Sequence, residues 1–305
     1  MPVRFRALVA GLRFAMIARK GSHMTTSSPA RPPLSIDTPA RDAAALSNAV
    51  EDLYERRLDV AVVRQAWGDA SLAEVAASLD GGTRDPGWNR PNAMMPPEDI
   101  QVLGTAATPT YSTPTGPTLE RYMQDANWYD RAPLFDGDPT AAVTTALARH
   151  AGGRPVEVLH APDGKRFSPF TVRRLGDGKG IGLHHDLHTS LEMFKDIAPG
   201  LDRGTLVSWV FTLQGPDSGG ELCVYNCPPD APDPPKMPNG FSWDLAGVEK
   251  RFGSVTIKTG TGDLFLFASA RLLHRVAPVA GPRARFTLGG FLALDARRER
   301  VLFWS

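Results

Sequence analysis

The sequence predicts a mainly β protein with a helical N-terminal part, an α+β fold whose core is an antiparallel sandwich or barrel. Two observations predict this class. Before residue 150, apolar residues recur at the spacing of helices, and after Gly153 the chain changes to short strands separated by turns rich in Gly and Pro. The 305 residues also suffice for one large domain with a substantial buried core.

Composition and charge narrow the classes of function. Hydrophobic residues make up 42% of the chain and charged residues 22%, as in ordinary globular proteins. The formal net charge of +1 gives no electrostatic reason to expect nucleic acid or an anionic membrane as a partner. The sequence has no run of 18 apolar residues, so we expect no helix that spans a bilayer. The partner we expect is a small molecule.

The cysteine content indicates a reducing compartment, and we expect a cytoplasmic protein. The chain has two cysteines, Cys223 and Cys227. Four residues apart on one strand, they would sit ~13 Å apart, which is too far for a disulfide. As a zinc pair they would lack two further ligands. We interpret both as small core or rim residues of a reduced protein.

The chain divides into three parts on its composition. Residues 1–24 are basic and apolar and end in "GSHM", so we interpret them as a tag or an upstream extension. Residues 25–150 are assigned to an N-terminal helical and loop region that buttresses the core. Residues 151–305 are assigned to the β core, which we expect to be the catalytic part.

Helical spacing is clearest between residues 41 and 79. The apolar positions there, Val62 and Val63 among them, predict two or three helices, with "GDAS" as a break and Ser71 as an N-cap opposite Glu74. The other elements expected in this region are loops over 81–118 and helices over 119–128 and 139–150.

Seven short segments of the core alternate or carry strand-forming residues, and Asp163-Gly164 marks a turn between the first two. The segment from Cys227 to Leu245 is too rich in proline for a central strand. We interpret it as a long loop over one end of the barrel, where Phe241 and Trp243 could cover a pocket. The expected strands are 155–160, 170–175, 205–213, 221–226, 254–259, 264–268 and 285–294.

Three of the seven histidines fall in the stretch "IGLHHDLHTS". On a strand, His184 and Asp186 would point to one face and His185 to the other. A metal site would need a third ligand, for which the candidates are His150, His160 and His274. His274 begins a strand that can lie beside the first one. Two histidines and a carboxylate on one face suit an Fe(II) ion that must also bind a cosubstrate and dioxygen.

A candidate anchor for an anionic cosubstrate follows His274. Arg285 and Thr287 share parity on the expected final strand, so their side chains would lie on one face. A guanidinium fork beside a hydroxyl is suited to the distal carboxylate of a dicarboxylate.

Three blocks of the sequence resemble the catalytic core of the Fe(II)/2-oxoglutarate-dependent oxygenases and occur in the same order as in that family. Within the family, the resemblance is greatest to the prolyl-hydroxylase-like branch. The blocks are "RRLGDGKGIGLHHD", "LVSWVFTLQGPDSGGEL" and "GTGDLFLFASARLLHRVAPVAGPRARFTLGGF". The resemblance covers residues 170–294 and implies a double-stranded β-helix (jelly roll) core with buttressing helices. It also implies the cofactors Fe(2+), 2-oxoglutarate and O2.

The resemblance assigns roles to individual residues. It implies His184, Asp186 and His274 as the catalytic iron ligands, with Arg285 and Thr287 holding 2-oxoglutarate. Arg283 lies near the spacing expected for the anchoring arginine and remains an alternative to Arg285. The stretch "PFTVRRL" lacks the tyrosine that usually helps to hold 2-oxoglutarate, so that contact stays unassigned.

Substrate contacts are assigned to Arg173, His188 and Trp243. A solvent-exposed turn is the alternative for His188, and loop packing is the alternative for Trp243. No peptide-binding module or basic groove is visible in the sequence. We therefore expect a free amino acid or a natural-product intermediate as substrate, with a peptidyl or protein residue as the alternative.

The resemblance implies hydroxylation of an unactivated C–H bond, with release of succinate and CO2. Related halogenases have a small residue in place of the carboxylate, which leaves room for chloride, whereas this chain has Asp186. Desaturation or cyclisation are alternative outcomes of the same chemistry. Two further alternatives are a zinc hydrolase that uses His184, His185 and His188, and a non-catalytic barrel that binds a metal or a small ligand.

Overall fold

The structure is a computed structural model. It describes residues 36–37, 46–67, 69–81, 100–106, 119–131, 138–186, 198–202, 204, 206–231, 235–238 and 243–305. The interpretation of residues 1–24 and the roles expected of His188 and Phe241 lie outside these residues. Among the described residues, no helix combines the length and apolarity needed to cross a membrane.

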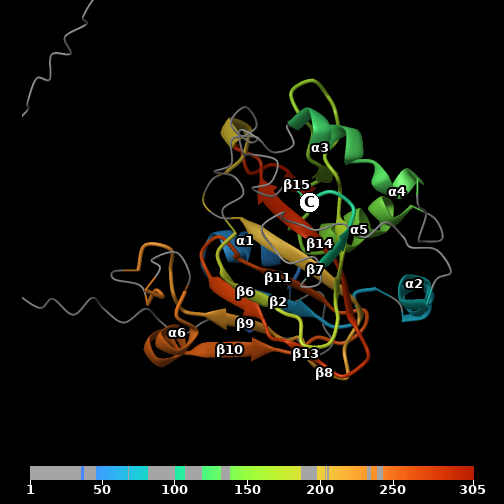
Figure 1. Ribbon diagram of the computed structural model, residues 1–305. Helices are drawn as coiled ribbons and strands as arrows, with labels where there is room; N and C mark the ends of the chain where they lie inside the picture. The colour runs from blue at the N-terminus through green and yellow to red at the C-terminus, as the bar shows by residue number, and fades with distance from the viewer. Residues whose placement is uncertain are drawn as a thin grey trace, which may run out of the picture. The chain divides into compact units, whose positions relative to one another are not determined.

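The core consists of two facing β-sheets, as in a jelly roll (Figure 1). The larger sheet has nine strands, in the order β1-β2-β11-β7-β14-β15-β4, with β5 paired to β14 and β3 paired to β5. Its strands are β1 (Ile36–Asp37), β2 (Val60–Val63), β3 (Gln101–Leu103), β4 (Val156–Val158), β5 (Thr171–Leu175), β7 (Val207–Gln214), β11 (Leu264–Phe267), β14 (Arg285–Leu294) and β15 (Val301–Trp304).

The smaller sheet has four strands in the order β10-β9-β12-β6, so β6 is an edge strand. Its strands are β6 (Ile181–His184), β9 (Leu222–Tyr225), β10 (Ser254–Ile257) and β12 (Leu273–Val276). A separate two-stranded ribbon joins β8 (Ser218–Gly219) to β13 (Val279–Ala280). The prediction of a mainly β, jelly-roll fold with helices around it is confirmed.

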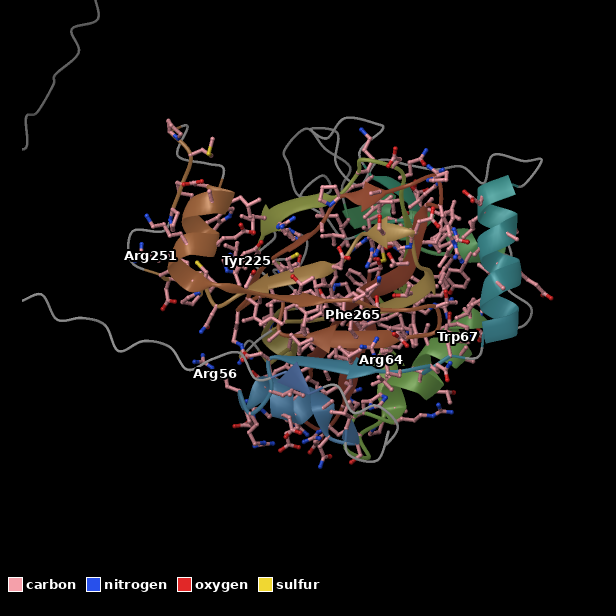
Figure 2. The ribbon with its side chains drawn as sticks, turned by 90° about the horizontal axis from the view of Figure 1, so that it is seen from below. Arg56, Arg64, Trp67, Tyr225, Arg251 and Phe265 are labelled. Atoms are coloured by element: carbon pink, nitrogen blue, oxygen red, sulfur yellow. The ribbon has the colours of Figure 1, made fainter. Side chains whose placement is uncertain are left out.

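Alternation along the strands of the smaller sheet separates two apolar clusters. Leu222 and Val224 of β9 face the larger sheet and join the main core with Trp209 and Phe265. Their neighbours on β9 face the opposite way, and Tyr225 packs under α6 (Leu245–Phe252). Figure 2 shows Tyr225 on the side of α6, with Phe265 farther from that helix.

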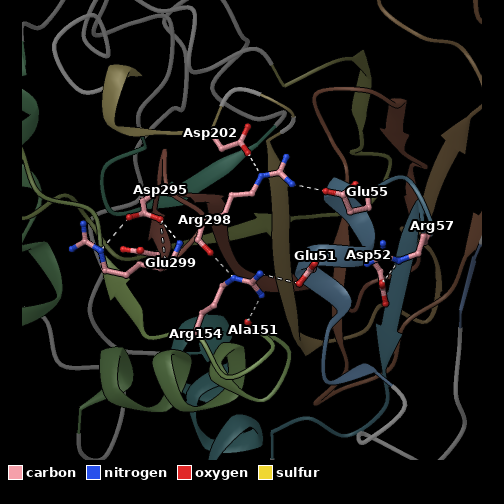
Figure 3. A network of polar contacts seen from close by, with 11 residues as sticks. Glu51, Asp52, Glu55, Arg57, Ala151, Arg154, Asp202, Asp295, Arg298 and Glu299 are labelled. Atoms are coloured by element: carbon pink, nitrogen blue, oxygen red, sulfur yellow. Dashed lines mark hydrogen bonds and ion pairs between the residues drawn. The ribbon is translucent and has the colours of Figure 1, made fainter.

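The other helices are α1 (Ala49–Tyr54), α2 (Asp69–Gly81), α3 (Leu119–Asp125), α4 (Trp128–Arg131) and α5 (Pro139–Ala148), and a 3-10 turn spans Ala198–Gly200. Polar contacts tie α1 to the chain after β14 (Figure 3). Arg298 donates to both Asp202 and Glu55. Arg154 bonds Glu51 at 2.9 Å and also donates to the carbonyl oxygen of Arg298. These contacts hold the N-terminal helix against the C-terminal part of the core.

Several local predictions were wrong. Val62 and Val63 belong to β2, a strand buried on both faces, because pairing with β11 overrides their helical spacing. The helix α2 begins at Asp69, so Ser71 lies inside its first turn and is not its N-cap. Residues 81–118 were expected to be loops but contain β3. The strand over 285–294 was expected to be the last one but is followed by β15. The N-terminal region therefore supplies strands to the larger sheet as well as helices.

Candidate active site

The antiparallel pairing of β6 and β12 brings the predicted iron ligands together. In the register of the two strands, His274 lies opposite His184, and their rings are 4.2 Å apart between centroids. Asp186 follows two residues after the end of β6. Its Oδ1 lies 3.6 Å from Nε2 of His184, and its Oδ2 lies 3.7 Å from Nε2 of His274. One ligand atom from each of the three side chains therefore falls within 4.8 Å of the other two.

Backbone hydrogen bonds hold both histidines in one orientation. Nδ1 of His184 lies 2.7 Å from the carbonyl oxygen of Gly182, and Nδ1 of His274 lies 2.8 Å from that of Leu272. If each Nδ1 carries the proton, each Nε2 has a lone pair available for a metal, on the side of the ring that faces Asp186. The edge of the His274 ring also packs against Phe267, with ring centroids 4.8 Å apart.

Burial keeps His274 in the form that binds a metal. Removal from water, with the neighbouring His184 as a smaller cause, lowers the pKa of His274 to about 3. The imidazole is therefore neutral at physiological pH and available as a ligand. Two imidazoles and one carboxylate are a donor set that suits divalent iron, with coordination positions left for other ligands. The residues present thus fit an iron ion.

Two serines orient the carboxylate, and sequence reasoning missed both. The hydroxyl of Ser208, on β7, lies 2.8 Å from Oδ2 of Asp186 and 2.9 Å from the hydroxyl of Ser269. The backbone N–H of Asp186 also donates to the carbonyl oxygen of Ser269 at 3.2 Å. The contacts come from residues far apart in the sequence, and isolated serines give no pattern by which they could be predicted.

A cavity opens beside the three ligands, between the two sheets. We call it the inner cavity; its lining includes His184, Asp186, His274, Arg173, Arg285 and Thr287. Arg285 and Thr287 reach it from alternate positions of β14, and Arg173 reaches it from β5, where it pairs with Thr287. The sequence assigned Arg173 to the substrate, but the structure places it in the cavity that also holds Arg285.

Arg285 is a buried cation, and Arg283 is not. Arg285 is 4% exposed, whereas Arg283 lies on the surface and its backbone N–H donates to Asp217. Burial, with repulsion from Arg173 as a smaller cause, lowers the pKa of Arg285 to about 10. Burial also lowers the pKa of Arg173. Within the described residues, no carboxylate forms an ion pair with Arg285, so the cavity favours an anionic ligand.

A second hollow lies beside β6, which is an edge strand in the described part of the chain. We call it the outer groove; its lining includes Ile181, Leu183, His184, Trp243, Leu245 and Lys236. His185 points to this side, as expected, and its Nε2 lies 3.1 Å from the carbonyl oxygen of Cys227. Trp243 packs against the ring of His185 at 5.6 Å. The structure thus places Trp243 in the outer groove and not in the inner cavity.

The other two histidines among the described residues lie outside the cluster. His150 is buried, with its Nδ1 3.0 Å from the carbonyl oxygen of Leu46, and His160 is exposed on the surface. Both cysteines are buried, as the sequence predicted, and neither forms a disulfide. Trp209 is fully buried, and its indole N–H donates to the carbonyl oxygen of Phe291.

The fold and this cluster define the class of protein: an Fe(II)/2-oxoglutarate-dependent oxygenase, as the sequence resemblance implied. More narrowly, the sequence model of the family described as "carrier-protein-independent halogenase WelO5" matches residues 34–305, and the chain belongs to this family. No curated protein sequence matches the chain. Proteins of this class use Fe(2+), 2-oxoglutarate and O2.

Comparison with solved structures finds similar chains at low sequence identity. An N-substituted L-amino acid dioxygenase from Burkholderia ambifaria AMMD, in complex with alpha-KG, is 14% identical, with a TM-score of 0.53 over 86% of this chain and 91% of that one. A 2OG-Fe(II) oxygenase family protein from Burkholderia pseudomallei is 18% identical, with a TM-score of 0.43 over 88% and 100% of the two chains. A prolyl hydroxylase from Trichoplax adhaerens is 16% identical, with a TM-score of 0.43 over 84% and 92%.

Proposed function

We propose that this protein is a dioxygenase that hydroxylates an unactivated C–H bond of a small molecule, with His184, Asp186 and His274 as the iron ligands. Fe(II) and 2-oxoglutarate, when bound, supply the activation of O2, and succinate and CO2 are the coproducts. The observation that carries the proposal is the buried carboxylate of Asp186 between the two histidine Nε2 atoms.

The inner cavity supports a role in holding 2-oxoglutarate. Arg285 and Thr287 offer a guanidinium fork and a hydroxyl to one carboxylate of the cosubstrate, at a distance from the ligands set by β14. Arg173 adds a second cation, which matches the second negative charge of a dicarboxylate. Arg173 would then take the place of the tyrosine that the stretch "PFTVRRL" lacks.

Asp186 favours hydroxylation over halogenation, although the family is named for a halogenase. A carboxylate at this position fills the place that chloride would need, and Ser208 holds it there. The substrate we propose is a free amino acid or a natural-product intermediate. The dioxygenase from Burkholderia ambifaria that shares the fold is named for N-substituted L-amino acids. A peptidyl residue is the alternative substrate, and a non-catalytic barrel is the alternative function.

Formation of succinate from 2-oxoglutarate tests the proposal. The purified protein should form succinate only when Fe(II), 2-oxoglutarate and O2 are all present, and His274→Ala should lose this activity. His160→Ala, which alters an exposed histidine outside the cluster, is the matched control and should keep it. A protein that binds iron but forms no succinate with any candidate substrate would be a non-catalytic barrel. A zinc-dependent hydrolytic activity would instead support the alternative that the protein is a zinc hydrolase.

A further inference from the structure

The outer groove and the inner cavity meet at the proposed iron site. Ile181, His184 and Val276 line both hollows. The side chain of His184 is 38% exposed, whereas that of His274 is 5% exposed and lines only the inner cavity. A molecule in the outer groove would therefore reach the iron site from the side of His184, while the inner cavity stays available to the cosubstrate.

The walls of the outer groove are mostly apolar. Leu183, Trp243 and Pro278 contribute apolar surface, and Leu245 is 38% exposed, an unusual exposure for a large aliphatic side chain. Burial of this surface would favour a ligand with an apolar body.

The charge of the groove is positive and comes mainly from one side chain. Among the described lining residues there is no carboxylate, and the two cations are Lys236 and Arg275. Arg275 is already engaged, because its Nε donates to the hydroxyl of Tyr225 at 2.8 Å and its Nη2 lies 3.5 Å from Glu249. Within the described part of the chain, no acidic side chain forms an ion pair with Lys236. Lys236 is thus the cation that remains available to a ligand.

Lys236 is held in place by the residues that adjoin the iron site. Its ammonium group lies 3.3 Å from the centroid of the Trp243 ring, and the two residues form an antiparallel β-bridge. Trp243 packs in turn on His185, which sits between the two proposed ligands His184 and Asp186 in the chain. This stack fixes a positive charge over the groove beside the site where the reaction would occur.

We propose that the outer groove binds the substrate and that Lys236 selects a molecule with an apolar body and a single carboxylate, a hydrophobic organic acid. The inference rests on the proposed function and names the substrate class of that site. One available cation matches one negative charge, and the apolar walls match the rest of the molecule. A neutral substrate would offer no negative charge to Lys236.

Binding can be measured without turnover, on full-length protein loaded with Mn(II) and saturating 2-oxoglutarate. The probes are a panel of aliphatic and aromatic carboxylic acids, N-acyl amino acids among them, each paired with its methyl ester and with the matching phosphate monoester. Calorimetry should show that the best acids bind more tightly than both partners. Lys236→Met should weaken the binding of these acids about tenfold, the size of one charge-assisted contact, and should leave the esters unchanged.

Two further variants separate charge from structure. Lys236→Arg should restore much of the affinity, and Lys250→Met, which removes an exposed lysine of α6 outside the groove, should not change it. The proposal is overturned if esters bind as tightly as acids, if phosphate monoesters bind best, if only neutral capped peptides bind, or if nothing in the panel binds. Succinate formation by the native protein with Fe(II) is measured in a separate experiment. If no succinate forms, the proposed function is contradicted, but the result of the binding experiment still stands.

Discussion

The hydroxyl of Ser208 donates a hydrogen bond of 2.8 Å to Oδ2 of Asp186, the oxygen that also faces His274. Oδ1, the other carboxylate oxygen, faces His184. A hydrogen bond to one oxygen orients the carboxylate as a metal ligand. This contact orients a side chain that lies just beyond the end of β6.

Ser208→Ala should weaken metal binding. Loss of a hydrogen-bonding partner of a ligand typically costs about 10- to 100-fold in metal affinity. Titration of the apoprotein with Mn(II) or Co(II) by calorimetry measures the change directly. Ser218→Ala removes an exposed serine outside the site and serves as the control. Equal metal affinities in both variants would show that the Ser208 contact does not support the ligand.

Arg285→Ala should weaken the binding of 2-oxoglutarate far more than that of the substrate. A charge-assisted, bidentate contact contributes roughly 1.5–3 kcal/mol, or about ten- to a hundredfold in affinity. Arg283→Ala is the matched control, because Arg283 is exposed and lies two residues away. Binding of 2-oxoglutarate to the Mn(II)-loaded proteins gives the comparison. If Arg283→Ala shows the loss and Arg285→Ala does not, the assignment of the anchor is wrong.

Asp186→Ala and Asp186→Gly should abolish hydroxylation, since each removes the anionic ligand from the cluster. The vacated position would give chloride a place to bind, but we expect no halogenated product without further changes. Mass spectrometry of reactions with and without chloride distinguishes these outcomes. Full hydroxylase activity in Asp186→Ala would exclude the carboxylate from the ligand set.

His150 should make the protein less stable in mild acid. Burial lowers the pKa of His150 from its ordinary value of 6.5. The unfolded chain therefore takes up a proton at this residue more readily than the folded one. The stability that the neutral, buried His150 contributes is fully present above pH ~6.5, and it is lost as the pH falls below this value. Urea unfolding from pH 8 to pH 5 should show a smaller pH dependence in His150→Gln than in the native protein; equal slopes would contradict this.

The strands β7, β9, β11 and β14 could be predicted because short strand-forming segments lie between turns rich in Gly and Pro, which is a local signal. The cluster of His184, Asp186 and His274 could be predicted only from the H-x-D spacing together with the family resemblance, because His274 is distant in the sequence. The strand β2 could not be predicted, because its four buried residues are compatible with a helix as well as a strand. Only the pairing with β11 determines that they form a strand. Ser208 and Lys236 could not be predicted either, since their roles depend on which strand or loop lies opposite them.

A crystal structure of the protein with Mn(II) and 2-oxoglutarate, in the absence of turnover, tests the central claim most directly. We expect one metal ion with His184 Nε2, His274 Nε2 and a carboxylate oxygen of Asp186 at roughly 2–2.3 Å, the usual range for such bonds. We also expect the distal carboxylate of 2-oxoglutarate on the guanidinium group of Arg285. A metal bound elsewhere, or bound here without His274, would contradict the account.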